Sequence, residues 1–131
     1  MGFKMNATIL VVDDSLMVRQ QVKRALAHDG FEIVEAQDGV DALEKANAAP
    51  EIALVICDVN MPRMGGLDFL ESFRREARFK AVPVVMLTTE AQSDLVARSK
   101  ALGAKGWIIK PFKPDLLAAA ARRLVPQASA A

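Results

Sequence analysis

Short apolar segments alternate five times with longer segments of helical periodicity, and this alternation constrains the fold more than any other feature. It begins with the β-rich run Thr8–Val12 and ends with a helical segment from about Pro114 to Leu124. Successive parallel strands need a crossover, and helices on both faces of a sheet supply it. A closed barrel requires about eight such units. The chain is therefore expected to be an α/β protein with a single open, doubly wound, five-stranded parallel sheet and five helices.

Apolar periodicity, together with Gly and Pro residues, places the expected elements along the chain. The expected strands cover residues 8–12, 31–36, 52–57, 84–87 and 107–109. The expected helices begin near Leu16, Asp38, Leu67, Glu90 and Pro114. Pro50 ends the second helix, and Gly103 is the expected cap of the fourth. Residues 8–125 thus form one domain, between a flexible lead at 1–7 and a disordered tail at 126–131.

The charge balance argues against a dedicated nucleic-acid binder. The 131 residues carry 17 Lys and Arg against 16 Asp and Glu, a formal net charge of +1. A nucleic-acid-binding domain is expected to carry a clear basic excess. The basic cluster Arg74-Arg75, with Arg78 and Lys80, is interpreted as a solvated helix end. A protein partner stays open, whereas the chain by itself is not expected to bind nucleic acid.

The expected compartment follows from the cysteine count and the apolar runs. Cys57 is the only cysteine, so neither a disulfide framework nor a thiolate metal site is expected. A lone cysteine and the lack of an export signal indicate the reducing cytoplasm. The longest apolar run, residues 81–87, is interrupted by Pro83 and is far too short to span a bilayer. We therefore expect a cytoplasmic protein that does not enter a membrane.

Polar residues collect where the expected strands end. In an open α/β sheet, the ligand site lies outside the carboxyl ends of the strands. The residues at these ends are Asp13 and Asp14 after the first strand, Asp58 after the third, Thr88 and Thr89 after the fourth, and Lys110 after the fifth. The second strand offers Gln37 and Asp38, which are not assigned to the site. Carboxylates, a hydroxyl and an ammonium are therefore expected to meet at one edge of the sheet.

This set of groups suits phosphoryl transfer to a carboxylate. Neighbouring carboxylates would repel one another, and their pKa values would rise unless a cation joined them. Mg²⁺ or Mn²⁺ is the expected cofactor, because carboxylate oxygens, water and phosphate are ligands that suit it. Asp58 would then act as the nucleophile, while Lys110 and Thr88 stabilise the transferring phosphoryl group.

Each of these residues also has an ordinary structural interpretation when it is taken alone. Asp14 and Thr88 could cap the helices that follow them. Asp58 could be a simple loop residue, and Lys110 could be a solvated surface lysine. Their joint occurrence at the ends of different strands favours the functional interpretation.

Four segments carry a more specific pattern. They are Val-Val-Asp13-Asp14-Ser, Cys-Asp58-Val-Asn60-Met-Pro62, Met-Leu-Thr88-Thr-Glu90 and Lys110-Pro111-Phe112. In this order and at this spacing, they resemble the response-regulator receiver domain of the CheY-like family in its stand-alone, chemotaxis-type form. The resemblance extends from about Thr8 to Leu124 and implies a flavodoxin-like (βα)5 fold.

The resemblance implies a phosphoacceptor and a set of metal ligands. Asp58 would accept a phosphoryl group from a sensor histidine kinase. Asp14, Asp58 and the backbone carbonyl of Asn60 would ligate the metal ion, and Asp13 would help through water.

The resemblance also implies how the phosphoryl group is held and released. Thr88 and Lys110 would contact the phosphoryl oxygens, and the Lys110–Pro111 bond is expected to be cis. Asn60 and Glu90 flank the site and would tune how quickly the acyl phosphate hydrolyses.

The implied switch pairs Thr88 with the aromatic residue at position 107. On phosphorylation the hydroxyl would move to the phosphoryl group, and the ring would turn inward. Here the ring is Trp107, and an indole needs more room than Tyr or Phe and a partner for its N–H. The alternative is that Trp107 is a fixed surface or interface residue.

The implied function is a phosphoacceptor switch rather than a turnover enzyme. The change of shape would reach a protein partner, such as a flagellar motor switch or another effector, through the last two helices and the fifth strand. A phosphatase could remove the phosphoryl group. The chain is expected to be a monomer that could dimerise when phosphorylated.

Other functions stay open at this point. The chain could be a phosphorelay intermediate that passes phosphate to a histidine phosphotransfer protein, or the excised receiver of a DNA-binding regulator. A phosphatase of the haloacid-dehalogenase type would need a second Asp two residues after Asp58, where the chain has Asn60. A flavodoxin-like binding module is disfavoured, because the strand-end carboxylates would repel the phosphate of FMN.

Overall fold

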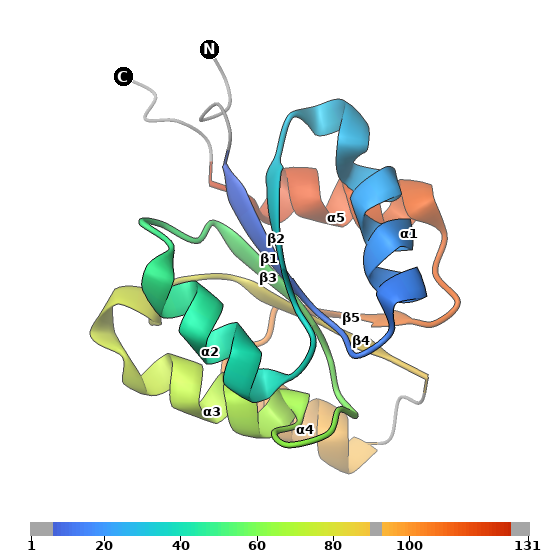
Figure 1. Ribbon diagram of the computed structural model, residues 1–131. Coiled ribbons are helices and arrows are strands. Elements are labelled where there is room, and N and C mark those ends of the chain that lie inside the picture. The colour runs from blue at the N-terminus through green and yellow to red at the C-terminus, as the bar shows by residue number, and fades with distance from the viewer. Residues whose placement is uncertain (1–6, 90–92, 127–131) are drawn as a thin grey trace.

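The computed structural model describes residues 7–89 and 93–126 and contains one five-stranded parallel sheet between two layers of helices (Figure 1). The strands are β1 (Thr8–Val12), β2 (Glu32–Ala36), β3 (Leu54–Asp58), β4 (Val84–Thr88) and β5 (Gly106–Ile109). The helices are α1 (Leu16–Leu26), α2 (Gly39–Ala48), α3 (Gly66–Arg75), α4 (Ser93–Ala101) and α5 (Pro114–Leu124), with short 3-10 turns η1 (Ala27–Asp29) and η2 (Ala77–Phe79). The strand order β2-β1-β3-β4-β5 confirms the predicted open, doubly wound fold.

Two strands run one residue further than predicted, and both extra residues belong to the candidate site. Asp58 pairs with Leu87, and Thr88 pairs with Ile109. Backbone pairing therefore fixes the positions of both residues, and Asp58 is not a simple loop residue. The predicted start of the fourth helix at Glu90 lies outside the described residues.

The alternation of side chains along each strand divides the core between two helical layers. Ile9 and Val11 pack with α1 and α5, whereas Leu10 and Val12 pack with α2 and α3. Figure 1 shows the same division, with α1 and α5 on one side of the sheet and α2, α3 and α4 on the other. Both faces of the sheet are covered, which explains why the central strands are apolar throughout.

Side-chain caps fix where the helices at the site begin. The Ser15 hydroxyl accepts a hydrogen bond from the Val18 N–H at 3.2 Å and caps α1. The Asp38 carboxylate accepts from the Asp41 N–H at 2.8 Å and caps α2. Because Ser15 caps α1, Asp14 is not needed for that role, and its side chain is available to the site.

The prediction that the basic cluster is a solvated helix end was wrong for Arg74, which is half-buried, whereas Arg75, Arg78 and Lys80 are exposed. The Arg74 guanidinium donates to the carbonyls of Leu102, Phe79 and Val82 at 2.9, 2.8 and 2.7 Å. Arg78 lies over the Phe79 ring, 4.6 Å from its centroid. These contacts tie α3 to the segment before β4 and to the end of α4.

The described chain begins one residue earlier than the predicted domain. Ala7 is 5 % exposed, and its carbonyl accepts a hydrogen bond from Glu32 N at 2.9 Å. Ala7 therefore belongs to the folded domain and not to the flexible lead assigned to residues 1–7, of which 1–6 lie outside the described residues. No helix in the described part of the chain is long and apolar enough to cross a membrane.

Candidate functional site

The carboxyl ends of four neighbouring strands form the frame of the site. Strand β3 pairs with β1 on one side and with β4 on the other, and β4 pairs with β5. Side chains two residues apart on a strand point to the same face of the sheet. Val11, Ile56 and Ile108 pack on the side of α1 and α5. Two residues further along each chain segment, Asp13, Asp58 and Lys110 therefore point to that side as well. The register and the alternation together bring these three side chains to one place.

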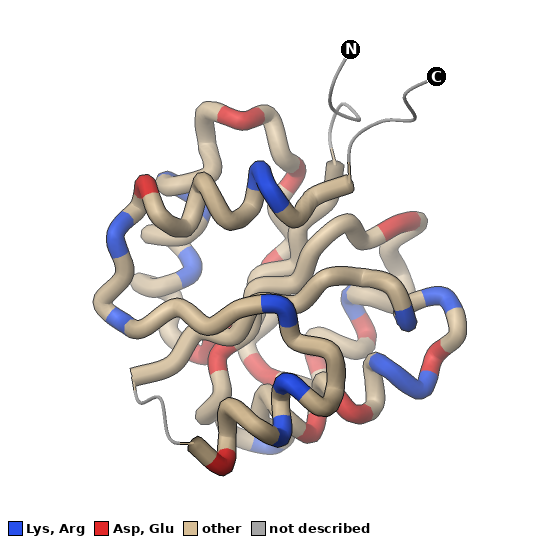
Figure 2. The backbone as a smooth tube through the Cα atoms, turned by 180° about the vertical axis from the view of Figure 1, so that it is seen from behind, with Lys and Arg blue, Asp and Glu red and all other residues tan. Residues whose placement is uncertain are grey.

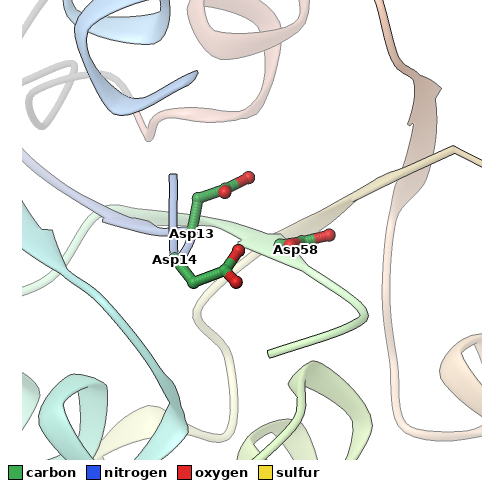
Figure 3. A group of neighbouring side chains, drawn as sticks. All are labelled: Asp13, Asp14 and Asp58. Atoms are coloured by element: carbon green, nitrogen blue, oxygen red, sulfur yellow. The ribbon is translucent and has the colours of Figure 1, made fainter. Parts of the chain in front are cut away.

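Three carboxylates meet at this edge, as predicted. One oxygen from each of Asp13, Asp14 and Asp58 lies within 4.8 Å of the others. Figure 3 shows Asp13 and Asp14 leaving the end of β1 beside Asp58. Asp13 is fully buried and Asp58 is 5 % exposed, whereas Asp14 faces solvent. The cluster is thus built into the protein on one side and open to solution on the other.

Lys110 supplies the positive charge of the cluster. Its Nζ lies 2.8 Å from Asp13 Oδ2 and 3.2 Å from Asp58 Oδ1. Burial alone would lower the pKa of Lys110, but the hydrogen bond and charge of Asp13, with the charge of Asp58, raise it instead. The lysine is therefore held as an ammonium ion between the two buried carboxylates.

The pKa of Asp58 is raised, chiefly by burial and then by the charge of Asp13. Lys110 and a hydrogen bond from the backbone N–H of Asn60 offset only part of this effect. When the three carboxylates and the Lys110 ammonium are all ionised, the cluster carries a net charge of two negative units. A divalent cation would restore the balance and favour the ionised form of Asp58.

The two oxygens of the Asp13 carboxylate have different partners. Its Oδ1 accepts a hydrogen bond from Ser15 N at 2.9 Å. Its Oδ2 is buried and lies 2.8 Å from the Lys110 ammonium. A buried carboxylate oxygen with remaining capacity suits a hydrated Mg²⁺ ion, which binds few carboxylates and keeps several waters.

The loop between β3 and α3 forms the outer wall of the site. Val59, Asn60, Met61, Pro62 and Gly65 line an open depression of about 390 Å³ together with Asp14. Asn60 is exposed, and its backbone N–H contacts the Asp58 carboxylate. A Cβ at Gly66 would collide with the backbone carbonyl of Asp58, so glycine is required where α3 begins.

Thr88 and Lys110 lie together at the ends of β4 and β5. Thr88 is 3 % exposed, and its backbone carbonyl accepts a hydrogen bond from Lys110 N at 2.8 Å. The Lys110–Pro111 peptide bond is cis, as the resemblance implied. Glu90, the second predicted tuning residue, lies outside the described residues.

Trp107 has a partner that sequence reasoning missed. Its Nε1–H donates to Ser99 Oγ at 2.7 Å, and the Ser99 hydroxyl donates in turn to the Val96 carbonyl at 3.0 Å. Ser99 is 1 % exposed in α4. Trp107 pairs with Met86, two residues before Thr88, so the indole and the threonine hydroxyl lie on the same face of adjacent strands.

Asp38 was left out of the site, and the structure shows it beside the loop that carries Asn60. Its side chain is almost fully buried and forms an ion pair with Arg63, with Arg63 Nε and Asp38 Oδ2 at 2.8 Å. The strand-end position of Asp38 was a usable signal. Nothing in the sequence marked Arg63, because the two residues are 25 positions apart.

An open, doubly wound parallel sheet with an acidic cluster and an ion-paired lysine at its carboxyl edge defines the class of receiver-like α/β proteins. A family model described as the response regulator receiver domain matches residues 9–122, and the chain belongs to this family.

Relatives and solved structures agree with this assignment. Chemotaxis protein CheY1 of Helicobacter pylori is 41% identical over 110 residues, which cover 83% of this chain and 89% of that protein. The CheY homolog of Campylobacter jejuni is 34% identical over 110 residues, covering 83% and 85% of the two chains. The structure of Vibrio cholerae chemotaxis protein CheY4 matches with a TM-score of 0.86 at 41% identity, over 93% of this chain and 100% of that one.

Proposed function

We propose that the chain is a single-domain response regulator that receives a phosphoryl group on Asp58 from a sensor histidine kinase. The observation that carries the proposal is Lys110, whose ammonium lies 3.2 Å from Asp58 and 2.8 Å from Asp13 inside an acidic cluster. The chemotaxis proteins among its relatives support a role in chemotaxis signalling. The protein would act in the cytoplasm as a phosphoacceptor switch, not as a turnover enzyme.

The proposed transfer exchanges one bond to phosphorus for another. A carboxylate oxygen of Asp58 forms the new O–P bond while the P–N bond of the kinase phosphohistidine breaks, and the imidazole nitrogen leaves with the electron pair. Lys110 stabilises the charge on the phosphoryl oxygens, and Thr88 donates a hydrogen bond to them. Water later attacks phosphorus and releases phosphate, at a rate that Asn60 and Glu90 would tune.

Mg²⁺ or Mn²⁺ is the cofactor of this proposal. Asp14, Asp58 and the backbone carbonyl of Asn60 would hold the ion, with Asp13 acting through water. When bound, the ion supplies positive charge to the phosphoryl oxygens. The excess negative charge of the cluster and the buried Asp13 Oδ2 support this assignment.

The proposed output surface is the face formed by α4, β5 and α5. A groove of about 410 Å³ on this face is lined by Trp107, Leu116 and Arg123, among other residues. Leu116 is 60% exposed and offers an apolar contact to a protein partner, such as a motor switch or another effector. The protein would signal as a monomer or as a phosphorylation-induced dimer, until hydrolysis or a phosphatase resets it.

A fluorescence experiment tests the proposal. A small-molecule phosphoryl donor is added with Mg²⁺, and the emission of Trp107, the only tryptophan, is followed. The wild-type emission should change, whereas Asp58→Ala should give no response and the exposed-site variant Asp68→Ala should respond like the wild type. A response that survives Asp58→Ala would contradict Asp58 as the acceptor. An identical response without divalent cations would contradict the metal assignment.

A further inference from the structure

We propose that Arg63 is a positioning residue for the metal ion: through its ion pair with Asp38, it fixes the loop that presents the backbone carbonyl of Asn60. The inference rests on the divalent-cation site of the proposed function. It concerns a residue three positions beyond Asn60 that does not itself belong to the acidic cluster.

The backbone conformation of Arg63 needs an external support. Its φ is 63°, in the left-handed region, and it is the only non-glycine residue with positive φ in the described part of the chain. Asn and Asp tolerate this region because their short side chains can bond to the local backbone, but arginine has no such advantage. Contacts outside the loop must therefore compensate for the unfavourable conformation.

The ion pair with Asp38 is such a contact. Arg63 Nε lies 2.8 Å from Asp38 Oδ2, and Nη2 lies 3.1 Å from Oδ1, so the guanidinium and the carboxylate meet in a two-point arrangement. The Asp38 side chain is 4% exposed, whereas that of Arg63 is 56% exposed. Asp38 is itself fixed by capping α2 through the Asp41 N–H. The Asp38 side chain is thus held in place by the fold, and the ion pair in turn restrains Arg63.

Two backbone hydrogen bonds hold the same loop at neighbouring points. Gly39 N donates to the Met64 carbonyl at 2.9 Å, and Gly66 N donates to the Val59 carbonyl at 2.9 Å. A Cβ at Gly39 would collide with Met64, so the start of α2 and the loop are in direct contact. The ion pair and these bonds together leave Asn60 little freedom to move away from Asp14 across the depression.

Electrostatics and positioning predict opposite effects on Mg²⁺ affinity when Arg63 is neutralised. Removing a positive charge near a cation site should strengthen cation binding. Loosening the loop should weaken it, because partners that orient a metal ligand contribute roughly tenfold or more to affinity. The sign of the change therefore separates a positioning role from a simple charge effect.

The test is calorimetric titration of Mg²⁺ into the full chain without a phosphoryl donor. We expect Arg63→Gln to weaken Mg²⁺ binding by roughly tenfold and Arg63→Lys, which keeps the charge, to recover part of that loss. Arg75→Gln is the matched control, because Arg75 is also ion-paired with a carboxylate, at 3.0 Å, but lies at the far end of α3. The control should bind Mg²⁺ like the wild type.

The outcomes distinguish this inference from the proposed function. Unchanged or tighter Mg²⁺ binding in Arg63→Gln would overturn the positioning role while leaving the proposed function intact. A wild-type protein that binds no Mg²⁺ would overturn both. If Arg63→Gln does not fold, Arg63→Gly replaces it, because Gly adopts positive φ without strain but supplies neither the ion pair nor a restricted backbone. Binding of wild-type strength by the folded Gly variant would equally overturn the role.

Discussion

Asp58 lies in an environment that favours its protonated form when no cation is bound. Burial and the charge of Asp13 raise its pKa in the folded protein. A carboxyl group with a raised pKa takes up a proton more readily in the folded than in the unfolded chain. Its stabilising effect is therefore present at low pH and is lost as the pH rises through the folded pKa. Ionised Asp58 thus destabilises the cation-free fold at neutral pH.

This linkage predicts how stability depends on pH. With the cation chelated, the free energy of unfolding should rise when the pH is lowered from about 7 to about 5, and the rise should shrink in Asp58→Asn. At neutral pH the Asn variant should be the more stable protein, because it carries no buried charge beside Asp13. Urea denaturation of both proteins measures these differences. An identical pH dependence in the two would contradict the raised pKa.

The ion pair of Asp38 limits the pH window of that experiment. The hydrogen bond from Arg63 lowers the pKa of Asp38, so the pair stabilises the fold above the ordinary carboxyl pKa and is lost on further acidification. The comparison must therefore stay above about pH 4.

The Ser99 hydroxyl accepts a hydrogen bond from the indole N–H of Trp107 at 2.7 Å. Ser99→Ala removes the acceptor of the indole N–H and should cost about 1–2 kcal/mol of stability. The tryptophan emission should shift at the same time, because the indole loses its partner. Steady-state fluorescence and urea denaturation measure both effects, with Ser72→Ala on α3 as the control. Unchanged emission and stability in Ser99→Ala would show that the hydrogen bond does not hold the ring.

At the scale of elements, Arg74 connects α3 to the segment before β4 and to the end of α4. Arg74→Ala would leave the carbonyls of Phe79, Val82 and Leu102 without this donor. We expect a loss of about 2–3 kcal/mol. Arg75 follows Arg74 in the sequence, but its side chain is 73% exposed. Arg75→Ala should therefore cost at most about 0.5 kcal/mol of stability. Equal losses in the two variants, measured by denaturant unfolding, would contradict the role of Arg74.

Local patterns predicted the elements well, because strand and helix periodicity are properties of neighbouring residues. They also predicted the meeting of Asp13, Asp58 and Lys110, since parallel strands end at a common edge. The contacts that were missed join distant parts of the chain. Arg74 donates to a carbonyl 28 positions away in the sequence, and Arg63 and Asp38 are 25 positions apart. Local sequence patterns cannot predict either contact. Charge alone made Arg74 look like a solvated residue.

On the scale of the whole molecule, the site and the proposed output face share two adjacent strands. Thr88 ends β4, and Trp107 lies beside β4 in β5 and is hydrogen-bonded to Ser99 of α4, so a change at the proposed phosphoryl site would have a short route to α4. Figure 2 shows Lys and Arg interspersed with Asp and Glu around the molecule, in keeping with the small net charge. This distribution suits a protein partner better than a nucleic acid.

The proposed function depends above all on Asp58 carrying the phosphoryl group. The most direct test is to treat the Mg²⁺-loaded protein with a phosphoryl donor, reduce the acyl phosphate with borohydride, and locate the modified residue by peptide mass mapping. Reduction converts a phosphorylated aspartate to homoserine. We expect homoserine at position 58 alone and none in Asp58→Asn. Homoserine at position 13 or 14, or an unmodified Asp58 in fully treated protein, would contradict it.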